Sequence, residues 1–133
     1  MLAVITARGG SKRIPHKNIK EFCGKPILAY SIEAAQSAQI FDEIMVSTDD
    51  AEIAAVAEHY GASVPFLRSA ETSNDFADTD TVLREVVQEY KNRGKEVEHL
   101  CCLYPTAPFV TGDTLRSAYE FFQKIKADEL VPV

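Results

Sequence analysis

The sequence lacks the long apolar stretches of a membrane protein. No run reaches 18 residues, so we expect no transmembrane helix. The apolar start, Met1–Thr6, is short and no basic region precedes it, which is not the pattern of a signal peptide. The three cysteines, Cys23, Cys101 and Cys102, show neither a CxxC pair nor Cys/His ligand spacing, so no zinc site is expected. We therefore expect reduced, mostly buried thiols in a cytoplasmic protein.

Acidic residues are missing from the first twenty positions. The net charge of −6 argues against general nucleic-acid binding. Residues 1–20 nevertheless carry +5, which leaves −11 on the other 113 residues. The five basic residues are Arg8, Lys12, Arg13, Lys17 and Lys20. An acidic chain that gathers positive charge in one short segment is expected to hold an anion there.

Apolar runs and helical periodicity alternate along the chain. Strands are predicted at Leu2–Thr6, Glu43–Ser47, Ser63–Leu67, His99–Leu103 and Leu130–Val133. Helices are predicted from Pro26 to Ala38, Ala51 to Tyr60, Thr79 to Arg93, and from Thr111 or Asp113 to Lys126. This order predicts one α/β domain over residues 1–133, a three-layer α/β/α, Rossmann-like arrangement with a mostly parallel sheet. Because the chain stops at the start of a strand, we expect the domain to be truncated at its C-terminus.

Three segments follow the carboxyl ends of predicted strands: Ala7–Asn18, Ser47–Asp50 and Tyr104–Val110. Ligands of such sheets bind outside these ends, so the three segments are expected to share one site. We expect Asp49 or Asp50 to cap the following helix, with metal binding as the alternative.

The first of these segments is rich in glycine and basic residues. Gly9 and Gly10 allow a tight turn that brings backbone N–H groups close to an anion, and the Ser11 hydroxyl adds a donor. The segment matches neither GxxxxGK[ST] nor GxGxxG, which disfavours a P-loop ATPase and a dinucleotide-binding domain. Its composition favours a polyphosphate site; a solvated basic surface loop is the alternative.

Residues 5–18, ITARGGSKRIPHKN, resemble the N-terminal motif of the CMP-sialic acid synthetase family, A-R-x-x-S-K-x-x-x-x-K-N. The resemblance continues through Cys23–Pro26, Val46–Asp50, Phe66–Arg68 and Tyr104–Phe109. It covers essentially the whole chain and implies the fold of nucleotide-diphospho-sugar transferases.

The resemblance also implies roles for particular residues. The implied nucleotide-binding residues are Ala7, Arg8, Gly9, Gly10, Ser11, Lys12, Lys17, Asn18, Arg68 and Thr79. Among them Arg8, Lys12 and Lys17 are the expected catalytic residues, because their charge would stabilise the phosphates. The implied border of the base and acceptor sugar is Tyr104, Pro105 and Thr106. The alternatives are a surface position for Arg68, a helix N-cap at Thr79, and prolines that only stiffen a turn.

The reaction that the resemblance implies is transfer of CMP from CTP to the anomeric hydroxyl of a nine-carbon 2-keto sugar acid, with release of pyrophosphate. Mg²⁺ would take part, with ligands mainly outside this chain; no metal ligand is assigned within it. The full-length enzyme would be a homodimer. The partners are thus CTP and an acidic sugar, with no nucleic acid and no membrane.

The acceptor sugar is inferred from details of the segment Tyr104–Val110, the loop after the fourth predicted strand. Ala107–Phe109, and the paired cysteines before the loop, resemble family members that activate pseudaminic acid. Sialic, legionaminic and 3-deoxy-manno-octulosonic acid remain alternatives, as does a non-catalytic nucleotide-binding module. A response-regulator-like signalling domain is disfavoured, because basic residues follow the first strand where that fold needs acidic ones.

Overall fold

The computed structural model describes residues 1–9, 19–69, 72, 78–105 and 111–125. Its main sheet has three parallel strands, β1 (Leu2–Thr6), β4 (Glu43–Ser47) and β5 (Leu100–Leu103), in the order β4-β1-β5. The helices are α1 (Ile27–Ala38), α2 (Ala51–His59), α4 (Thr79–Asn92) and α5 (Gly112–Ile125). A short antiparallel hairpin of β2 (Glu21–Phe22) and β3 (Lys25–Pro26) leads into α1.

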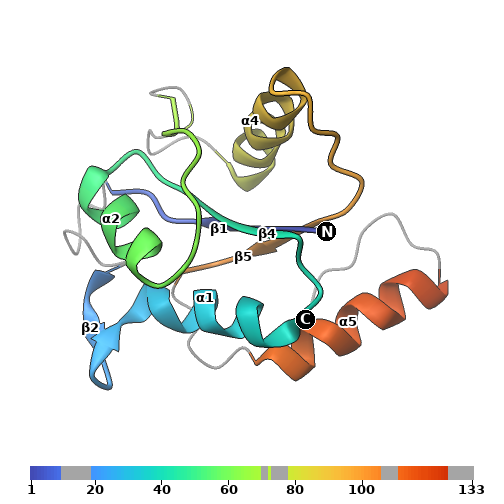
Figure 1. Cartoon of the computed structure of the whole chain (residues 1–133), viewed down its shortest axis with the longest axis horizontal. Coiled ribbons are helices and arrows are strands. Elements are labelled where there is room, and N and C mark those ends of the chain that lie inside the picture. Colours follow the sequence, from blue (N-terminus) through green and yellow to red (C-terminus); the bar gives the residue numbers. More distant parts are fainter. Residues whose placement is uncertain (10–18, 70–71, 73–77, 106–110, 126–133) are drawn as a thin grey trace.

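Alternation along the central strand β1 divides the core between two faces. Leu2 and Val4 pack with residues of α4, while Ala3 and Ile5 pack with residues of α1. Figure 1 shows α4 on one side of the sheet and α1 and α5 on the other. The predicted three-layer α/β fold with a parallel sheet is therefore confirmed for the described residues. The first four side chains of β1 are buried and that of Thr6 is half-buried, as expected of a parallel strand covered on both faces.

Most predicted elements are found, and the exceptions have local causes. β1 and β4 agree with the prediction residue for residue, and α5 begins where predicted, because Thr111 Oγ1 accepts a hydrogen bond from the Thr114 N–H at 3.1 Å. The strand predicted from Ser63 to Leu67 is wrong: only a bridge between Ser63 and Met45 forms. Pro65 lies in this segment and has no N–H to extend the ladder. The strand predicted at Leu130–Val133 lies outside the described residues.

Residues 7–25 are rich in Gly, Lys and Arg, a composition that predicts a loop, but the part of this segment just before α1 forms the β2–β3 hairpin. Cys23 and Gly24 form the turn of the β2–β3 hairpin with φ of 50° and 94°. Two consecutive positive φ angles are the signature of a type I′ turn, which matches the twist of a hairpin. Pro26 pairs with Glu21 and has ψ of 137°, so it precedes the helix and is not part of its first turn.

Two burial predictions are wrong. Cys23 is exposed, because it occupies the tip of the hairpin turn, while Cys101 and Cys102 are half-buried on β5. The periodicity of the helix predicted from Thr79 to Arg93 places Val87 on the inward face, but Val87 is 36% exposed. The buried stripe of α4 consists of Val82, Val86 and Tyr90. Val87 follows Val86 in the sequence and therefore lies beside this stripe on the helix surface.

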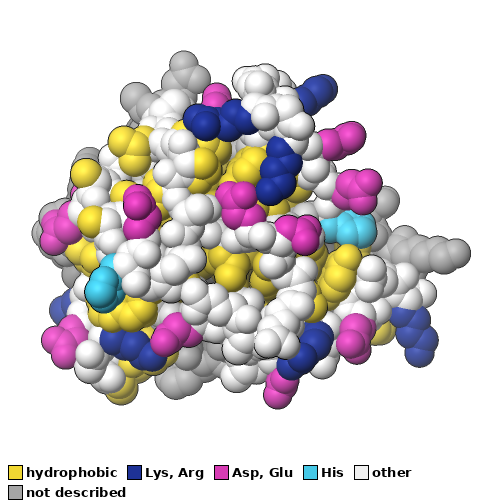
Figure 2. Space-filling view, viewed as in Figure 1, with side chains coloured by type: hydrophobic (Ala, Val, Ile, Leu, Met, Phe, Trp, Pro, Cys, Tyr) yellow, Lys and Arg dark blue, Asp and Glu magenta, His cyan; other side chains and the backbone are white. Residues whose placement is uncertain are grey.

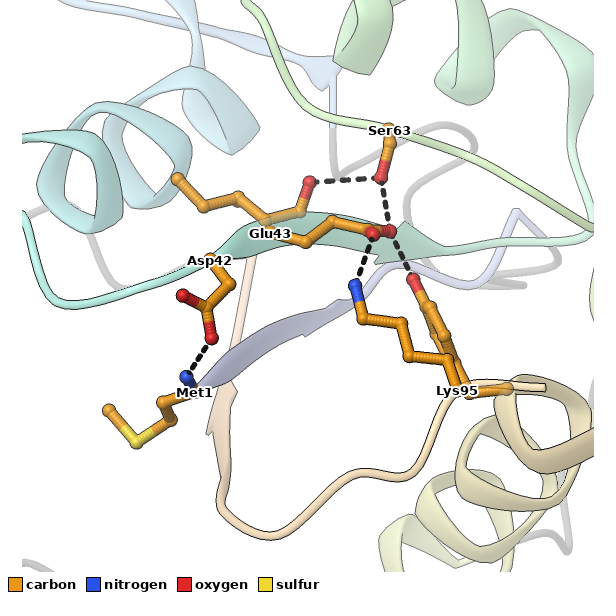
Figure 3. A network of polar contacts seen from close by, with 7 residues as sticks. Met1, Asp42, Glu43, Ser63 and Lys95 are labelled. Atoms are coloured by element: carbon orange, nitrogen blue, oxygen red, sulfur yellow. Dashed lines mark hydrogen bonds and ion pairs between the residues drawn. The ribbon is translucent and has the colours of Figure 1, made fainter. Parts of the chain in front are cut away.

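A polar network joins β4, the Ser63 bridge and the chain after α4 (Figure 3). The Glu43 carboxylate accepts hydrogen bonds from Ser63 Oγ at 2.9 Å, from Tyr90 Oη, and from Lys95 Nζ at 3.2 Å. Beside it, the Met1 ammonium pairs with Asp42 at 2.6 Å. This network lies at the amino ends of the strands, at the opposite edge of the sheet from the segments predicted to bind ligand.

The described surface is mixed in charge. In Figure 2, acidic and basic side chains are interspersed over the face shown, with hydrophobic atoms visible between them. The described part of this face therefore has no broad basic surface of the kind that nucleic-acid binding needs. Among the described residues, no helix is both long and apolar enough to cross a membrane.

Candidate nucleotide site

The carboxyl ends of β1 and β4 are joined directly where the candidate site begins. The Ala7 N–H donates to Ser47 O at 2.8 Å, so the two chains remain side by side as they leave the sheet. Ala7 is completely buried. Because β5 runs parallel to β1 on the other side, Tyr104 leaves the sheet at the same edge. The described parts of the three predicted segments thus share one edge.

Gly9 is fixed against the two aspartates after β4. Its N–H donates to Asp49 Oδ1 at 2.9 Å. A Cβ added at Gly9 would lie 2.6 Å from Asp50 Cβ, closer than side chains tolerate. Glycine is needed here for close approach, a reason that the sequence did not show. The Gly9 N–H, predicted to face an anion, is bonded to a carboxylate in this structure.

Asp50 caps α2, as was expected of one of the two aspartates. Its Oδ1 accepts hydrogen bonds from the N–H groups of Glu52 at 2.8 Å and Ile53 at 3.1 Å. The backbone N–H of Asp50 is held in turn by the buried Thr48 hydroxyl at 3.1 Å. The cap fixes the direction in which the chain leaves β4, and therefore the position of Asp49.

Arg68 reaches the same edge from the segment that follows the Ser63 bridge. Its backbone N–H donates to Thr48 O at 2.8 Å, and its Nη2 donates to Thr72 O at 2.5 Å. Burial lowers the pKa of its guanidinium, the charges of Asp49 and Glu85 oppose this, and Arg8 lowers the pKa further. Asp49, Glu85 and Arg8 therefore lie within electrostatic range of Arg68. Arg68 is half-buried, not the plain surface arginine that was the alternative.

One donor of Arg68 stands out. Its Nε is buried and has no hydrogen-bond partner within the described part of the chain. An unsatisfied buried donor is costly, so native structures rarely contain one without a reason. A guanidinium whose fork is only partly used is suited to binding an anion at this edge.

The chain just after β5 and the start of α4 meet through two side chains predicted for the site. Tyr104 Oη lies 3.5 Å from Thr79 Oγ1, although the two residues come from different elements. Thr79 is the first residue of α4; the N-cap is Asp78, which accepts from the Thr81 N–H at 2.8 Å. The alternative of Thr79 as N-cap is therefore wrong. Pro105, which follows Tyr104, is buried.

Several predicted site residues lie outside the described residues: Gly10, Ser11, Lys12, Lys17, Asn18 and Thr106. Among the residues that sequence reasoning did not assign are Ser31, whose hydroxyl donates to Tyr104 O at 2.8 Å, and Glu85, which binds Ser69. Ser31 carried a signal that was overlooked, because it interrupts the apolar face of a helix between Leu28 and Ile32. Glu85 showed no such signal in the sequence, since acidic residues are common on predicted helices.

The described carboxylates do not form a metal centre. No group of three or more His, Cys, Asp or Glu side chains gathers within the described residues. Asp50 Oδ1 is used by the α2 cap and Asp49 Oδ1 by Gly9.

A parallel α/β sheet with arginine- and glycine-bearing segments at its carboxyl edge defines a protein of the Rossmann-like α/β class, whose ligands bind at that edge. The chain matches the model of the Cytidylyltransferase family over residues 2–131, and it belongs to that family. The family expected from the sequence motifs is thereby confirmed.

Individual relatives agree with this assignment. The chain is 48% identical to pseudaminic acid cytidylyltransferase of Campylobacter jejuni over 91% of its own length and 52% of that protein. It is 40% identical to CMP-N,N′-diacetyllegionaminic acid synthase of Legionella pneumophila over its whole length and 57% of that protein. The chain thus spans about half the length of these curated relatives.

Solved structures support the fold. The structure of CMP:2-keto-3-deoxy-manno-octonic acid synthetase complexed with CTP aligns with a TM-score of 0.76 and 23% identity. The alignment covers 95% of this chain and 48% of that one.

Proposed function

We propose that this protein is a cytidylyltransferase that moves CMP from CTP to the anomeric hydroxyl of pseudaminic acid, releasing pyrophosphate. One observation carries the proposal. Gly9, Asp49, Arg68 and Tyr104 gather at one sheet edge in a chain that is 48% identical to pseudaminic acid cytidylyltransferase over most of its length. We treat residues 1–133 as one nucleotide-binding domain.

The proposed chemistry is a direct in-line transfer. The anomeric oxygen bonds to the α-phosphorus as its hydroxyl proton leaves, and the bond from that phosphorus to the pyrophosphate oxygen breaks. No covalent enzyme intermediate is required, so the residues act by positioning and by charge. Arg8, Lys12 and Lys17 would stabilise the charge that develops on the leaving phosphates, and Arg68 would hold one phosphate through its fork.

The remaining nucleotide contacts follow the same scheme. The backbone from Ala7 to Gly10, with Ser11 and Asn18, would surround the nucleotide, and Thr79 would lie near the base. Tyr104, Pro105 and Thr106 would border the base and the acceptor sugar. The Thr79–Tyr104 contact supports this arrangement, because it brings the two parts of the proposed base pocket to one place.

Mg²⁺ would supply neutralising charge between phosphate oxygens when bound. Asp49 and Asp50 each accept backbone N–H groups at Oδ1, and no group of three or more metal-ligating side chains gathers within the described residues. Following the family resemblance, we propose that the Mg²⁺ ligands lie mainly outside this chain. We further propose a cytoplasmic homodimer that works on free CTP and a free sugar acid, without membrane or nucleic-acid partners.

The test is product analysis with the intact protein, CTP and MgCl₂. Pseudaminic, legionaminic, sialic and 3-deoxy-manno-octulosonic acids are supplied separately, and the CMP-sugar is measured by mass spectrometry together with pyrophosphate. Pseudaminic acid is expected to give the highest kcat/KM. A higher value for legionaminic acid would move the assignment to the second relative's substrate. CTP binding without pyrophosphate release from any sugar would favour the non-catalytic nucleotide-binding module.

A further inference from the structure

The Tyr104–Pro105 segment is tied to helix α1 by one buried hydroxyl. Ser31 Oγ donates to the carbonyl oxygen of Tyr104 at 2.8 Å, across 73 positions of sequence. Ser31 is only 2% exposed and lies among the apolar residues by which α1 packs on the sheet. A buried serine needs a hydrogen-bond partner, and within a helix the usual one is a carbonyl of the preceding turn. Here the hydroxyl reaches across to another segment instead.

The Tyr104 side chain points away from this attachment. It is 57% exposed, and its hydroxyl lies 3.5 Å from Thr79 Oγ1 at the start of α4. The backbone of Tyr104 is thus held from one layer of the fold while its ring extends toward the other. Since Tyr104 directly follows β5, the Ser31 bond fixes the chain at the point where it leaves the sheet.

We propose that Ser31 is a positioning residue for the transfer reaction: its hydroxyl sets the placement of Tyr104 and Pro105 against the bound nucleotide. The inference rests on the proposed function, in which these two residues border base and sugar. In-line transfer is sensitive to small displacements, since a shift of about 1 Å can cost about a hundredfold in rate. Loss of the hydroxyl leaves the Tyr104 carbonyl without this partner and loosens the backbone at Tyr104.

The kinetic experiment uses Ser31→Ala and Ser31→Thr in the intact protein. Ser37→Ala is the control, because Ser37 lies on the same helix and its hydroxyl donates within that helix, to Ala34 O at 3.1 Å. We expect Ser31→Ala to lower kcat by about tenfold to a hundredfold while the Kd for CTP changes less than about threefold. Ser31→Thr keeps the hydroxyl and should restore most of kcat.

A second measurement does not depend on activity. Amide hydrogen exchange in the peptide that contains Tyr104 should become faster in Ser31→Ala, with peptides of α1 unchanged and Ser37→Ala like the wild type. If the wild type makes no CMP-sugar, the proposed function fails, yet the exchange difference still decides whether Ser31 holds the backbone at Tyr104. Equal kcat and equal exchange in Ser31→Ala and Ser37→Ala would overturn the inference.

Discussion

The backbone N–H of Gly9 donates to Asp49 Oδ1 at 2.9 Å, which joins the segment after β1 to the segment after β4. The Asp49 carboxylate thus accepts a hydrogen bond from the Gly9 N–H, which the sequence predicted to face an anion. The negative charge of Asp49 also raises the pKa of Arg68, which opposes the lowering caused by burial. Asp49 therefore both shapes this edge of the sheet and places a negative charge beside the proposed phosphate site.

Asp49→Asn should strengthen CTP binding. The amide oxygen can still accept from Gly9, while the charge that repels phosphate is removed. Two unit charges about 4 Å apart in water interact by about 1 kcal/mol. We therefore expect a Kd lower by about two- to fivefold, which corresponds to about 0.5–1 kcal/mol. Isothermal titration at low and high salt measures it, and the gain should shrink at high salt. Glu58→Gln, an exposed acid on α2, is the control and should leave the Kd unchanged; equal effects of the two variants would refute a local role for Asp49.

Arg68→Ala should weaken CTP binding by about tenfold to a hundredfold, the value of hydrogen bonds from a charged group. Arg68→Lys keeps the charge but not the planar fork, and should recover only part of the affinity. Fluorescence competition with a labelled nucleotide measures the Kd. Arg84→Ala, an exposed arginine paired with Asp80 on α4, serves as the control. Wild-type affinity in Arg68→Ala would assign that arginine a purely structural role.

Gly9→Ala should reduce both stability and CTP binding. The added Cβ would lie 2.6 Å from Asp50 Cβ, so the loop must move, at a cost of about 1–3 kcal/mol. Gly24→Ala is the matched comparison: its φ is 94° and the added Cβ meets nothing within 4 Å. That variant should lose about 1–2 kcal/mol through backbone strain but bind CTP normally. Urea denaturation and calorimetry separate the two cases; normal CTP binding by Gly9→Ala would contradict the close-approach argument.

Glu43→Gln should destabilise the protein at neutral pH. Burial alone would raise the pKa of Glu43, but hydrogen bonds from Tyr90, Ser63 and Lys95 outweigh it and hold the pKa below its ordinary value of 4.5. A depressed carboxyl pKa adds stability above the unfolded pKa, and that stability is lost as pH falls through the folded pKa. The difference between wild type and Glu43→Gln should therefore shrink as pH falls below about 4.5.

Urea midpoints from pH 7 to pH 3 give this profile. Glu58→Gln, in which an exposed acid on α2 is neutralised, should show no comparable trend. A gap between wild type and Glu43→Gln that stays constant over this range would show that the Glu43 charge is not what stabilises the network.

Cys23 should react with iodoacetamide well before the other two thiols. It is exposed at the hairpin tip, whereas burial raises the pKa of Cys101 to about 11 and also raises the pKa of Cys102. The thiolate is the reactive form, so both β5 thiols should be slow at pH 7.5. Mass spectrometry of tryptic peptides over time measures the order, with Cys23→Ser as the control. Rapid labelling of Cys101 in folded protein would show that β5 is more accessible than the structure indicates.

The sequence was sufficient for the secondary structure wherever a pattern was long. The short apolar run at Leu2–Thr6 and the periodicity of α4 predicted elements that the structure reproduces within a residue. It failed where a single residue changes the outcome. Pro65 stops the strand predicted after Ser63, and the turn at Cys23 and Gly24 turns a predicted loop into a hairpin.

The sequence by itself determined the layered α/β fold and the family, because alternation, period and motif are local along the chain. Only the tertiary structure decided which polar groups meet: Gly9 with Asp49, Ser31 with Tyr104, and Tyr104 with Thr79. Such contacts join residues 25 to 73 positions apart. They arise from strand order and helix placement, which bring three distant segments to one edge, and no local pattern encodes that distance.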